Sequence, residues 1–204
     1  MNASVKSKRS WLIPLLLIGI IVGPFLFAWV LVQKGHLYEM RSNHHGDLIA
    51  SLPNIKTVAL FDVNKKESMQ GSELLGKWWL MYVGPEKCYS ECHDIVYNMR
   101  QIRTALGKDT HRLERIFLAD HHCPDVRCEQ YVSTHYPDML NVRMEPSAFE
   151  KLFANISHPA EREVIGELYI IDPKGHIMMH YSADIESKSV LADLKRLLKL
   201  SKIG

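Results

Sequence analysis

Residues 78–93 read WWLMYVGPEKCYSECH, and this stretch decides the fold. Its first seven positions, up to Gly84, are continuously apolar, which is typical of a strand covered on both faces, as in parallel sheets. Beyond it, apolar side chains recur at helical spacing from about Cys88 to Leu106. The stretch therefore predicts a buried strand that leads directly into a helix, with Cys88 and Cys92 at the junction.

The sequence on both sides of this stretch continues the alternation of strands and helices. Pro173-Lys174-Gly175 lies between two apolar runs and predicts a hairpin late in the chain. Further strands are expected at residues 57–61, 115–119, 167–172 and 176–181, and further helices at residues 148–156 and 190–200. This order resembles that of thioredoxin-like proteins. We therefore expect an α/β, thioredoxin-like fold over residues 55–204, with helices flanking a central mixed sheet.

Residues 11–32 form a long apolar segment, with no charged side chain across 22 positions. A helix of that length spans about 33 Å, enough to cross a hydrocarbon core of ~30 Å. The segment is longer than the apolar part of a cleavable signal peptide, and no small-residue cleavage motif follows it. It predicts one N-terminal transmembrane helix.

The flanking residues predict the orientation of this helix. Lys6, Lys8 and Arg9 precede it closely, which favours residues 1–10 in the cytoplasm and the domain outside. Residues 33–54 are polar and contain several turn formers, so we expect them to form a linker. Because the chain does not start with an Arg- and Ser-rich leader, we expect a bacterial inner membrane, with the domain facing the periplasm, where disulfides can form.

Charge and cysteine content narrow the classes of function. The formal net charge is +2 and no long basic run is present, which argues against a nucleic-acid partner. The four cysteines form two close pairs, Cys88 with Cys92 and Cys123 with Cys128. We therefore expect the chemistry of this chain to take place at cysteine thiols.

The first pair is a C-x3-C motif at the start of the predicted helix. The helix dipole and the neighbouring Lys87 favour the thiolate of Cys88, which makes it the more nucleophilic sulfur. Cys92 lies one turn further on and could resolve a mixed disulfide, provided that Cys88 lies in the loop. Two thiolates at this spacing could equally bind Cu(I). A pair of buried, unreactive cysteines is the remaining alternative.

Residues 77–84 (KWWLMYVG), followed by the C-x3-C motif, resemble the Sco/SenC family of cytochrome c oxidase assembly proteins, as does YIIDPKG at residues 169–175. The resemblance implies a membrane-anchored thioredoxin-like domain that binds copper, or reduces thiols, in delivering copper to the Cu-A centre. It implies copper as the cofactor and Cys88 and Cys92 as ligands or redox thiols. The implied partner is a cytochrome c oxidase subunit or another thiol or copper protein.

The chain departs from this family pattern at the third copper ligand. The family carries a histidine a few residues before the tyrosine of the late strand, and the corresponding residue here is Val164. His158 is the nearest upstream candidate for a metal ligand, and a solvated loop histidine is the alternative. Gly166 stands where thioredoxins carry a cis-proline, which favours a specialised thiol–disulfide protein over a general reductase.

The second cysteine pair follows another predicted strand. A right-handed crossover between parallel strands at residues 78–84 and 115–119 would place both strand ends at the same edge of the sheet. Cys123 and Cys128 would then lie on the same rim as Cys88. Three interpretations stay open for this second pair: a structural disulfide, a relay that exchanges electrons with the first pair, or soft-metal ligands together with an adjacent histidine.

The cysteine pattern predicts thiol chemistry, and the Sco/SenC resemblance implies a membrane-anchored thiol–disulfide oxidoreductase or copper chaperone that assists Cu-A assembly in cytochrome c oxidase. If the chain is an enzyme, we expect a thiol–disulfide oxidoreductase that acts through Cys88 and Cys92. The alternative is a non-catalytic, membrane-tethered interaction or assembly module with the same fold.

Overall fold

The computed structural model describes residues 12–33, 44–84, 90–119, 127–154, 156 and 164–203. Two compact units, Met1–Asn43 and His44–Gly204, divide the chain. The first unit contains helix α1 (Leu12–Gln33), whose described apolar side chains are largely exposed. Within the described residues, no helix combines the length and the hydropathy that crossing a membrane requires.

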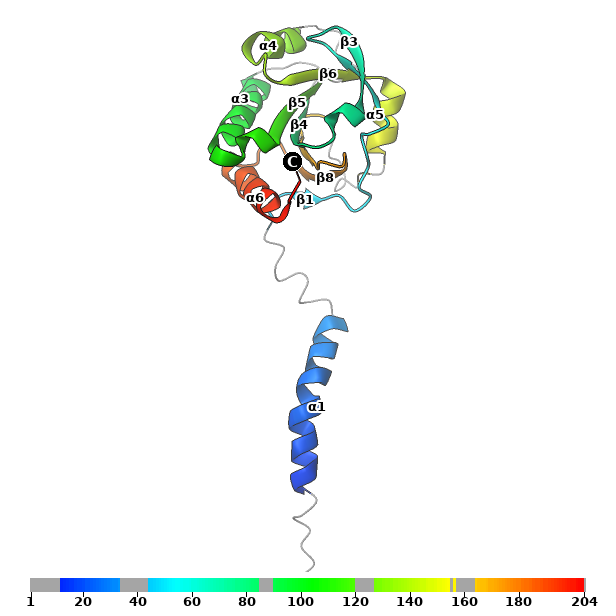
Figure 1. The fold of residues 1–204 in the computed structure, drawn as a ribbon, viewed down its shortest axis with the longest axis vertical. Coiled ribbons are helices and arrows are strands. Elements are labelled where there is room, and N and C mark those ends of the chain that lie inside the picture. The colour runs from blue at the N-terminus through cyan, green and yellow to red at the C-terminus, as the bar shows by residue number, and fades with distance from the viewer. Residues whose placement is uncertain are drawn as a thin grey trace, which may run out of the picture. The chain divides into compact units, whose positions relative to one another are not determined.

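An eight-stranded mixed sheet forms the centre of the second unit (Figure 1). Its strands lie in the order β1-β8-β7-β4-β5-β6-β2-β3. Their bounds are β1 (Asp47–Leu48), β2 (Ala59–Asp62), β3 (Glu67–Gln70), β4 (Trp78–Gly84), β5 (Leu113–Ala119), β6 (Leu140–Met144), β7 (Leu168–Ile171) and β8 (Ile177–Tyr181). The adjacent strands β4, β5 and β6 are parallel, and the other neighbouring pairs are antiparallel.

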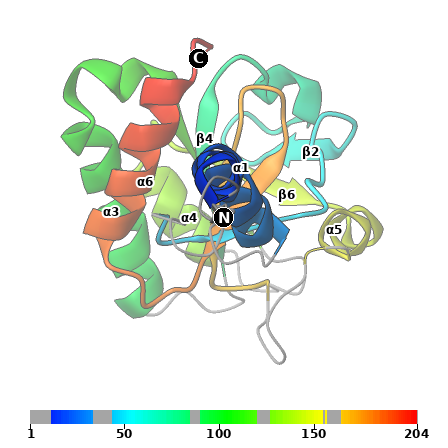
Figure 2. The same cartoon turned by 90° about the horizontal axis from the view of Figure 1, so that it is seen from below.

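Helices cover both faces of this sheet (Figure 2). Three of them pack on one face and one packs on the other. The first group is α3 (Ser90–Ala105), α4 (Arg127–His135) and α6 (Ser187–Leu200), and the helix on the opposite face is α5 (Pro146–Phe153). Two short 3-10 helices, η1 (Gly71–Leu74) and η2 (Gly107–Arg112), complete the described helical structure.

The side chains of β4 alternate between two buried clusters. Leu80 and Tyr82 belong to the cluster beneath α3, α4 and α6, whereas Met81 and Val83 belong to the cluster beneath α5. All four side chains are buried. An uninterrupted apolar run is therefore needed here because both faces of the strand are covered, and this confirms the prediction made from the sequence.

The predicted strands and helices of the domain are present, together with elements to which no residue range was assigned from the sequence: β1, β3, β6, α4 and the two 3-10 helices. β6 alternates apolar and polar residues, a strand pattern that was not recognised from the sequence. Its Asn141 is buried, and the Nδ2 of this residue donates to the carbonyl of Glu129 at 3.0 Å. β3 and α4 are mainly polar in sequence. β1 lies inside residues 33–54, which we expected to form a linker, and it pairs with β8. A strand of two residues is too short for periodicity to reveal.

Candidate functional site

The parallel strands β4 and β5 end at the same edge of the sheet. Their register pairs Gly84 with Ala119, the last residue of each strand. The two strands therefore end side by side, as the crossover rule predicted. Cys88 and Cys123, each four positions beyond its strand, lie outside the described residues.

Cys92 is the cysteine whose side chain the structure describes. It lies in the first turn of α3, where it is 2% exposed and belongs to the buried cluster beneath α3, α4 and α6. Its sulfur is part of a disulfide. The other three cysteines of the chain have side chains outside the description, and Cys128 itself is the second residue of α4.

An aromatic stack joins α3 to α4 next to this cysteine. The rings of His93 and Tyr131 are stacked with centroids 3.7 Å apart and planes inclined by 11°. His135 stacks on the other side of Tyr131 at 4.3 Å. Sequence reasoning missed this contact, because no single-sequence signal links a residue of one helix to a residue of the next.

The segment before β7 lies against the end of β4. Gly166 has φ of +86°, a conformation that glycine adopts readily, and its N–H donates to the carbonyl of Val83 at 2.8 Å. The N–H of Val83 donates in turn to the carbonyl of Glu167 at 3.1 Å. The residue that stands in place of the thioredoxin cis-proline is thus adjacent to the strand that leads to the first cysteine pair. Among the described residues no peptide bond is cis.

A buried polar cluster follows Gly166. His180 Nδ1 lies 3.0 Å from Glu167 Oε2, and the hydroxyl of Tyr169 donates to the same carboxylate oxygen at 3.3 Å. Burial, and then the Glu167 carboxylate, raises the pKa of Tyr169 above its ordinary value. In the sequence, this cluster is marked by Glu167 and His180, two polar residues within otherwise apolar runs. Hydropathy alone does not show that these two side chains meet.

The described residues do not assemble a metal site. No group of three His, Cys, Asp or Glu side chains that could hold a metal ion occurs among them. At Val164, where the resemblance drawn from the sequence implies a histidine, the backbone carbonyl accepts a 3.4 Å hydrogen bond from the Tyr169 hydroxyl. His158 lies outside the described residues.

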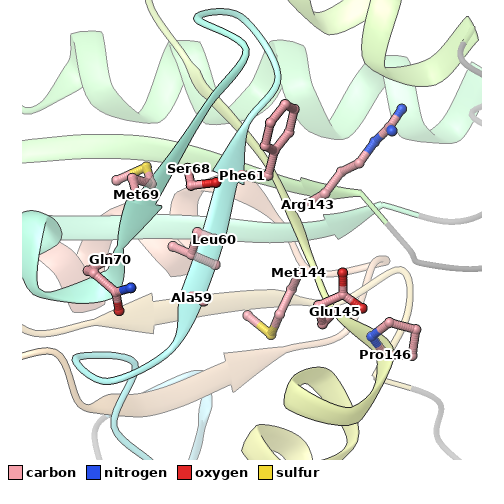
Figure 3. A pocket seen from close by; sticks show the side chains of 10 residues that line it. All are labelled: Ala59, Leu60, Phe61, Ser68, Met69, Gln70, Arg143, Met144, Glu145 and Pro146. Atoms are coloured by element: carbon pink, nitrogen blue, oxygen red, sulfur yellow. The ribbon is translucent and has the colours of Figure 1, made fainter.

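A hollow of about 550 Å³ lies between β2, β3 and the end of β6 (Figure 3). It is at the same sheet edge as the ends of β4 and β5, because Arg143 of β6 pairs in register with Ala119. Figure 3 shows Phe61 and Arg143 projecting side by side from neighbouring strands. The Arg143 guanidinium donates to both carboxylate oxygens of the buried Glu129. The Arg143 charge is therefore paired, and the hollow is lined by polar as well as apolar residues, among them Gln70 and Glu145.

A protein-family model described as "Transmembrane-like, thioredoxin-like, C-terminal domain" matches residues 78–201. No curated protein sequence matches the chain.

Solved structures of similar fold include several Sco proteins. Copper-bound ScoI from Arabidopsis thaliana is 14% identical, with a TM-score of 0.56 over 76% of this chain and 99% of that chain. Yeast Sco1 is 17% identical, with a TM-score of 0.58 over 74% and 99% of the two chains. A SCO1/SenC family lipoprotein from Bacillus anthracis is 16% identical, with a TM-score of 0.54 over 72% and 95%. These matches confirm the predicted thioredoxin-like fold and the structural resemblance to Sco/SenC proteins.

Proposed function

The chain belongs to the family of transmembrane-like, thioredoxin-like C-terminal domains, and from this premise we propose that it is a membrane-anchored thiol–disulfide exchange protein of the Sco type. The observation that carries the proposal is the disulfide of Cys92, which lies in the first turn of α3 beside the carboxyl edge of the sheet. A disulfide at this edge of the sheet supports a role for Cys92 in thiol–disulfide exchange.

The proposed partner of Cys92 in this disulfide is Cys88. In the reduced pair, the positive end of the α3 dipole stabilises a thiolate, and Cys88 attacks one sulfur of a partner's disulfide. A bond forms between Cys88 and that sulfur, and the partner's other sulfur leaves as a thiolate. The thiolate of Cys92 then attacks the sulfur of Cys88 and releases the second thiolate of the partner. The partner gains two electrons, and the Cys88–Cys92 disulfide forms.

The partner we propose is a copper protein whose ligand thiols must be reduced before they bind metal, with a cytochrome c oxidase subunit as the leading candidate. Support comes from the fold shared with Sco proteins, some of which were crystallised with copper bound. In this view the partner protein is the one that binds copper, and this chain carries copper only as a cargo, if at all. Val164 offers no third donor, and Cys92 offers no free thiolate while it is in a disulfide. We therefore favour exchange over stable copper storage.

The proposed location of the domain in the cell follows from its disulfide chemistry. A disulfide persists in an oxidising compartment, so we place the domain outside the cytoplasm, in the periplasm of a bacterium. The exposed apolar side chains of α1, among them Phe25 and Trp29, favour insertion of this helix into the inner membrane. The family description and the lipoprotein of similar fold agree with attachment to a membrane.

Exchange is tested on the full-length chain in detergent, fully reduced and mixed with an oxidised peptide that carries the thiols of a Cu-A site. The native chain should reduce the peptide with second-order kinetics. Cys88→Ser should abolish the reaction, and Cys92→Ser should stop it at a mixed disulfide that mass spectrometry detects. Thr104→Ala, an exposed change at the far end of α3, is the matched control.

Two outcomes would contradict this function. If both cysteine variants support oxidase assembly in cells as well as the native chain does, the domain is a non-catalytic interaction module. If instead the reduced chain retains Cu(I) against a competing chelator, and loses it on Cys88→Ser, while exchange with the peptide is slow, the domain is a copper chaperone.

A further inference from the structure

Helix α6 carries positive charge along its outward face. Residues 187–203 contain five cationic side chains and a single acidic one, Asp193, which is buried. At roughly 100° per residue, Lys188, Lys195 and Lys199 fall within an arc of about 40°, and all three are exposed. The opposite side of the helix packs into the buried cluster beneath α3, α4 and α6. The exposed face of α6 therefore presents several positive charges and no negative one.

These charges are not neutralised by the domain itself. Among the described residues, no carboxylate forms an ion pair with Lys188, Lys195 or Lys199. Figure 1 shows α6 beside α3 at the periphery of the domain, so no other element covers its outward face. A group of like charges repels itself, and an anionic partner relieves this repulsion. The charge of the face thus selects a negatively charged partner.

Two exposed apolar side chains lie among these cations at the end of the helix. Leu200, the last residue of α6, is 76% exposed, and Ile203 is 54% exposed. Each follows a lysine directly, Lys199 and Lys202. The guanidinium of Arg112 donates to the carbonyl of Ile203 at 3.1 Å and so holds this residue beyond the helix end. Cations beside exposed apolar groups suit a lipid surface, because the apolar groups enter the interface while the charges meet anionic headgroups.

The chain enters the domain beside the same helix. The buried carboxylate of Asp193 in α6 accepts hydrogen bonds from the backbone N–H groups of His45 and Gly46, at the start of the second unit. Residues 34–43 connect this point to α1, which ends at Gln33. Ten residues span at most about 36 Å. With α1 as the membrane anchor, the part of the domain that contacts α6 stays within that reach of the lipid.

We propose that the outward face of α6, from Lys188 to Ile203, is a docking surface for anionic lipid headgroups of the membrane that holds the chain. This inference rests on the anchoring part of the proposed function. Because the tether confines the domain near the membrane, a contact too weak to recruit a free protein is enough. Docking gives the cysteine edge of the sheet a constant orientation toward a partner in the same membrane. The exposed Leu200 and Ile203 favour lipid over an acidic protein as the occupant.

The test uses the full-length chain, reconstituted in vesicles of phosphatidylcholine alone or of phosphatidylcholine and phosphatidylglycerol in equal amounts. A membrane-impermeant reagent acetylates exposed lysines, and mass spectrometry reads the rate at Lys202 relative to Lys56, an exposed lysine outside α6. This ratio should be about threefold lower in the vesicles that contain phosphatidylglycerol. High salt should remove the difference, because it screens the charges.

Variants of α6 show whether its charges cause this protection. A chain with Lys188→Glu, Lys195→Glu and Lys199→Glu should acetylate Lys202 equally fast in both kinds of vesicle. Glutamine at the same three positions should remove most of the protection, and it avoids acidic side chains in the last turn of a helix. The matched control reverses the same number of exposed lysines outside α6 and should keep the protection. These are Lys66, Lys151 and Lys174.

The outcomes separate this surface from the anchor. Equal acetylation of Lys202 in the two vesicles, in a native chain that resists carbonate extraction, would overturn the docking surface and leave the anchor intact. Protection that survives the triple change to glutamine would overturn it as well. Protection in cell membranes without any in the vesicles would assign the face to an acidic protein instead. Extraction of the native chain by carbonate would count against the anchor, and so against the proposed function.

Discussion

The carboxylate of Asp193 holds the first residues of the domain against helix α6. It is 2% exposed and accepts hydrogen bonds from the backbone N–H of His45 at 2.7 Å, the backbone N–H of Gly46 at 3.1 Å and the hydroxyl of Tyr181 at 3.1 Å. Its other oxygen lies 3.2 Å from His45 Nδ1. One buried anion therefore satisfies several donors from two distant parts of the sequence.

Asp193→Ala should lower the free energy of unfolding by about 3 kcal/mol, because it leaves these donors buried without an acceptor. Asp193→Asn keeps one carbonyl oxygen and should have a smaller effect. Urea denaturation measures both, with Asp47→Ala in the exposed part of β1 as the control. If Asp193→Ala lowers the free energy of unfolding no more than Asp47→Ala does, water replaces the carboxylate as the acceptor without a loss of stability.

Two buried tyrosines make the domain sensitive to alkaline pH. Burial, and then a neighbouring carboxylate, raises the pKa of Tyr169 beside Glu167 and of Tyr181 beside Asp193. A pKa raised in the folded state means that the unfolded chain loses these protons first as the pH rises. The contribution to stability is therefore complete below about pH 10 and declines above it.

At pH 11 each tyrosine should account for about 1.4 kcal/mol of lost stability. The free energy of unfolding is measured at pH 8 and at pH 11. Tyr169→Phe and Tyr181→Phe should each reduce the difference between these two values by about that amount. Tyr97→Phe, which changes an exposed tyrosine, should leave the difference unchanged. An undiminished pH difference in the first two variants would mean that other groups cause the alkaline transition.

At the scale of elements, the sequence predicts well those strands whose local pattern agrees with their environment. β4, β5, β7 and β8 are apolar because both their faces are covered, and each was expected from its composition. β6 was missed although it alternates apolar and polar side chains, and α4 received no residue range because its sequence is mainly polar. The amide of Asn141 is buried in β6 because the backbone of Glu129 and the hydroxyl of Ser133, both in α4, accept its protons.

The candidate site divides in the same way. The common edge of β4 and β5 follows from a general rule of strand connection, so the sequence was enough to predict it. The contact of His93 with Tyr131, and the pairing of His180 with Glu167, require the three-dimensional register of separate elements. The sequence shows which residue types are available for such contacts. Which of these residues come into contact depends on the three-dimensional arrangement of the helices and strands.

The junction between β4 and its cysteine segment tolerates no extra methyl group. A Cβ on Gly84 would lie 2.3 Å from Cζ of Phe117, the side chain that β5 places beside it. Gly84→Ala should therefore cost about 1–3 kcal/mol in unfolding free energy through overpacking. Phe117→Leu removes the ring edge, so the double variant should be more stable than the sum of the two single changes predicts. Strict additivity in denaturant unfolding would exclude this contact as the cause.

At the scale of the whole molecule, the two compact units Met1–Asn43 and His44–Gly204 should serve separate purposes. We expect the first to hold the chain in a membrane and the second to carry the thiols. The described side chains of α1 are apolar and exposed, among them Leu17 at 55% and Ile20 at 62%. A soluble domain rarely exposes so much apolar surface without a partner or a membrane to cover it.

Lysine at positions 17 and 20 tests this division. Each charge near the centre of a membrane helix opposes insertion by about 2.5–3.5 kcal/mol, so Leu17→Lys with Ile20→Lys should release the chain into the soluble fraction after alkaline carbonate extraction. The native chain should stay in the membrane pellet, as should Leu200→Lys, which changes an exposed leucine of α6. Urea unfolding of the second unit should be the same in the native chain and in the doubly charged variant, because α1 lies outside this unit. Extraction of the native chain by carbonate, or equal retention of the doubly charged variant, would show that α1 is not the anchor.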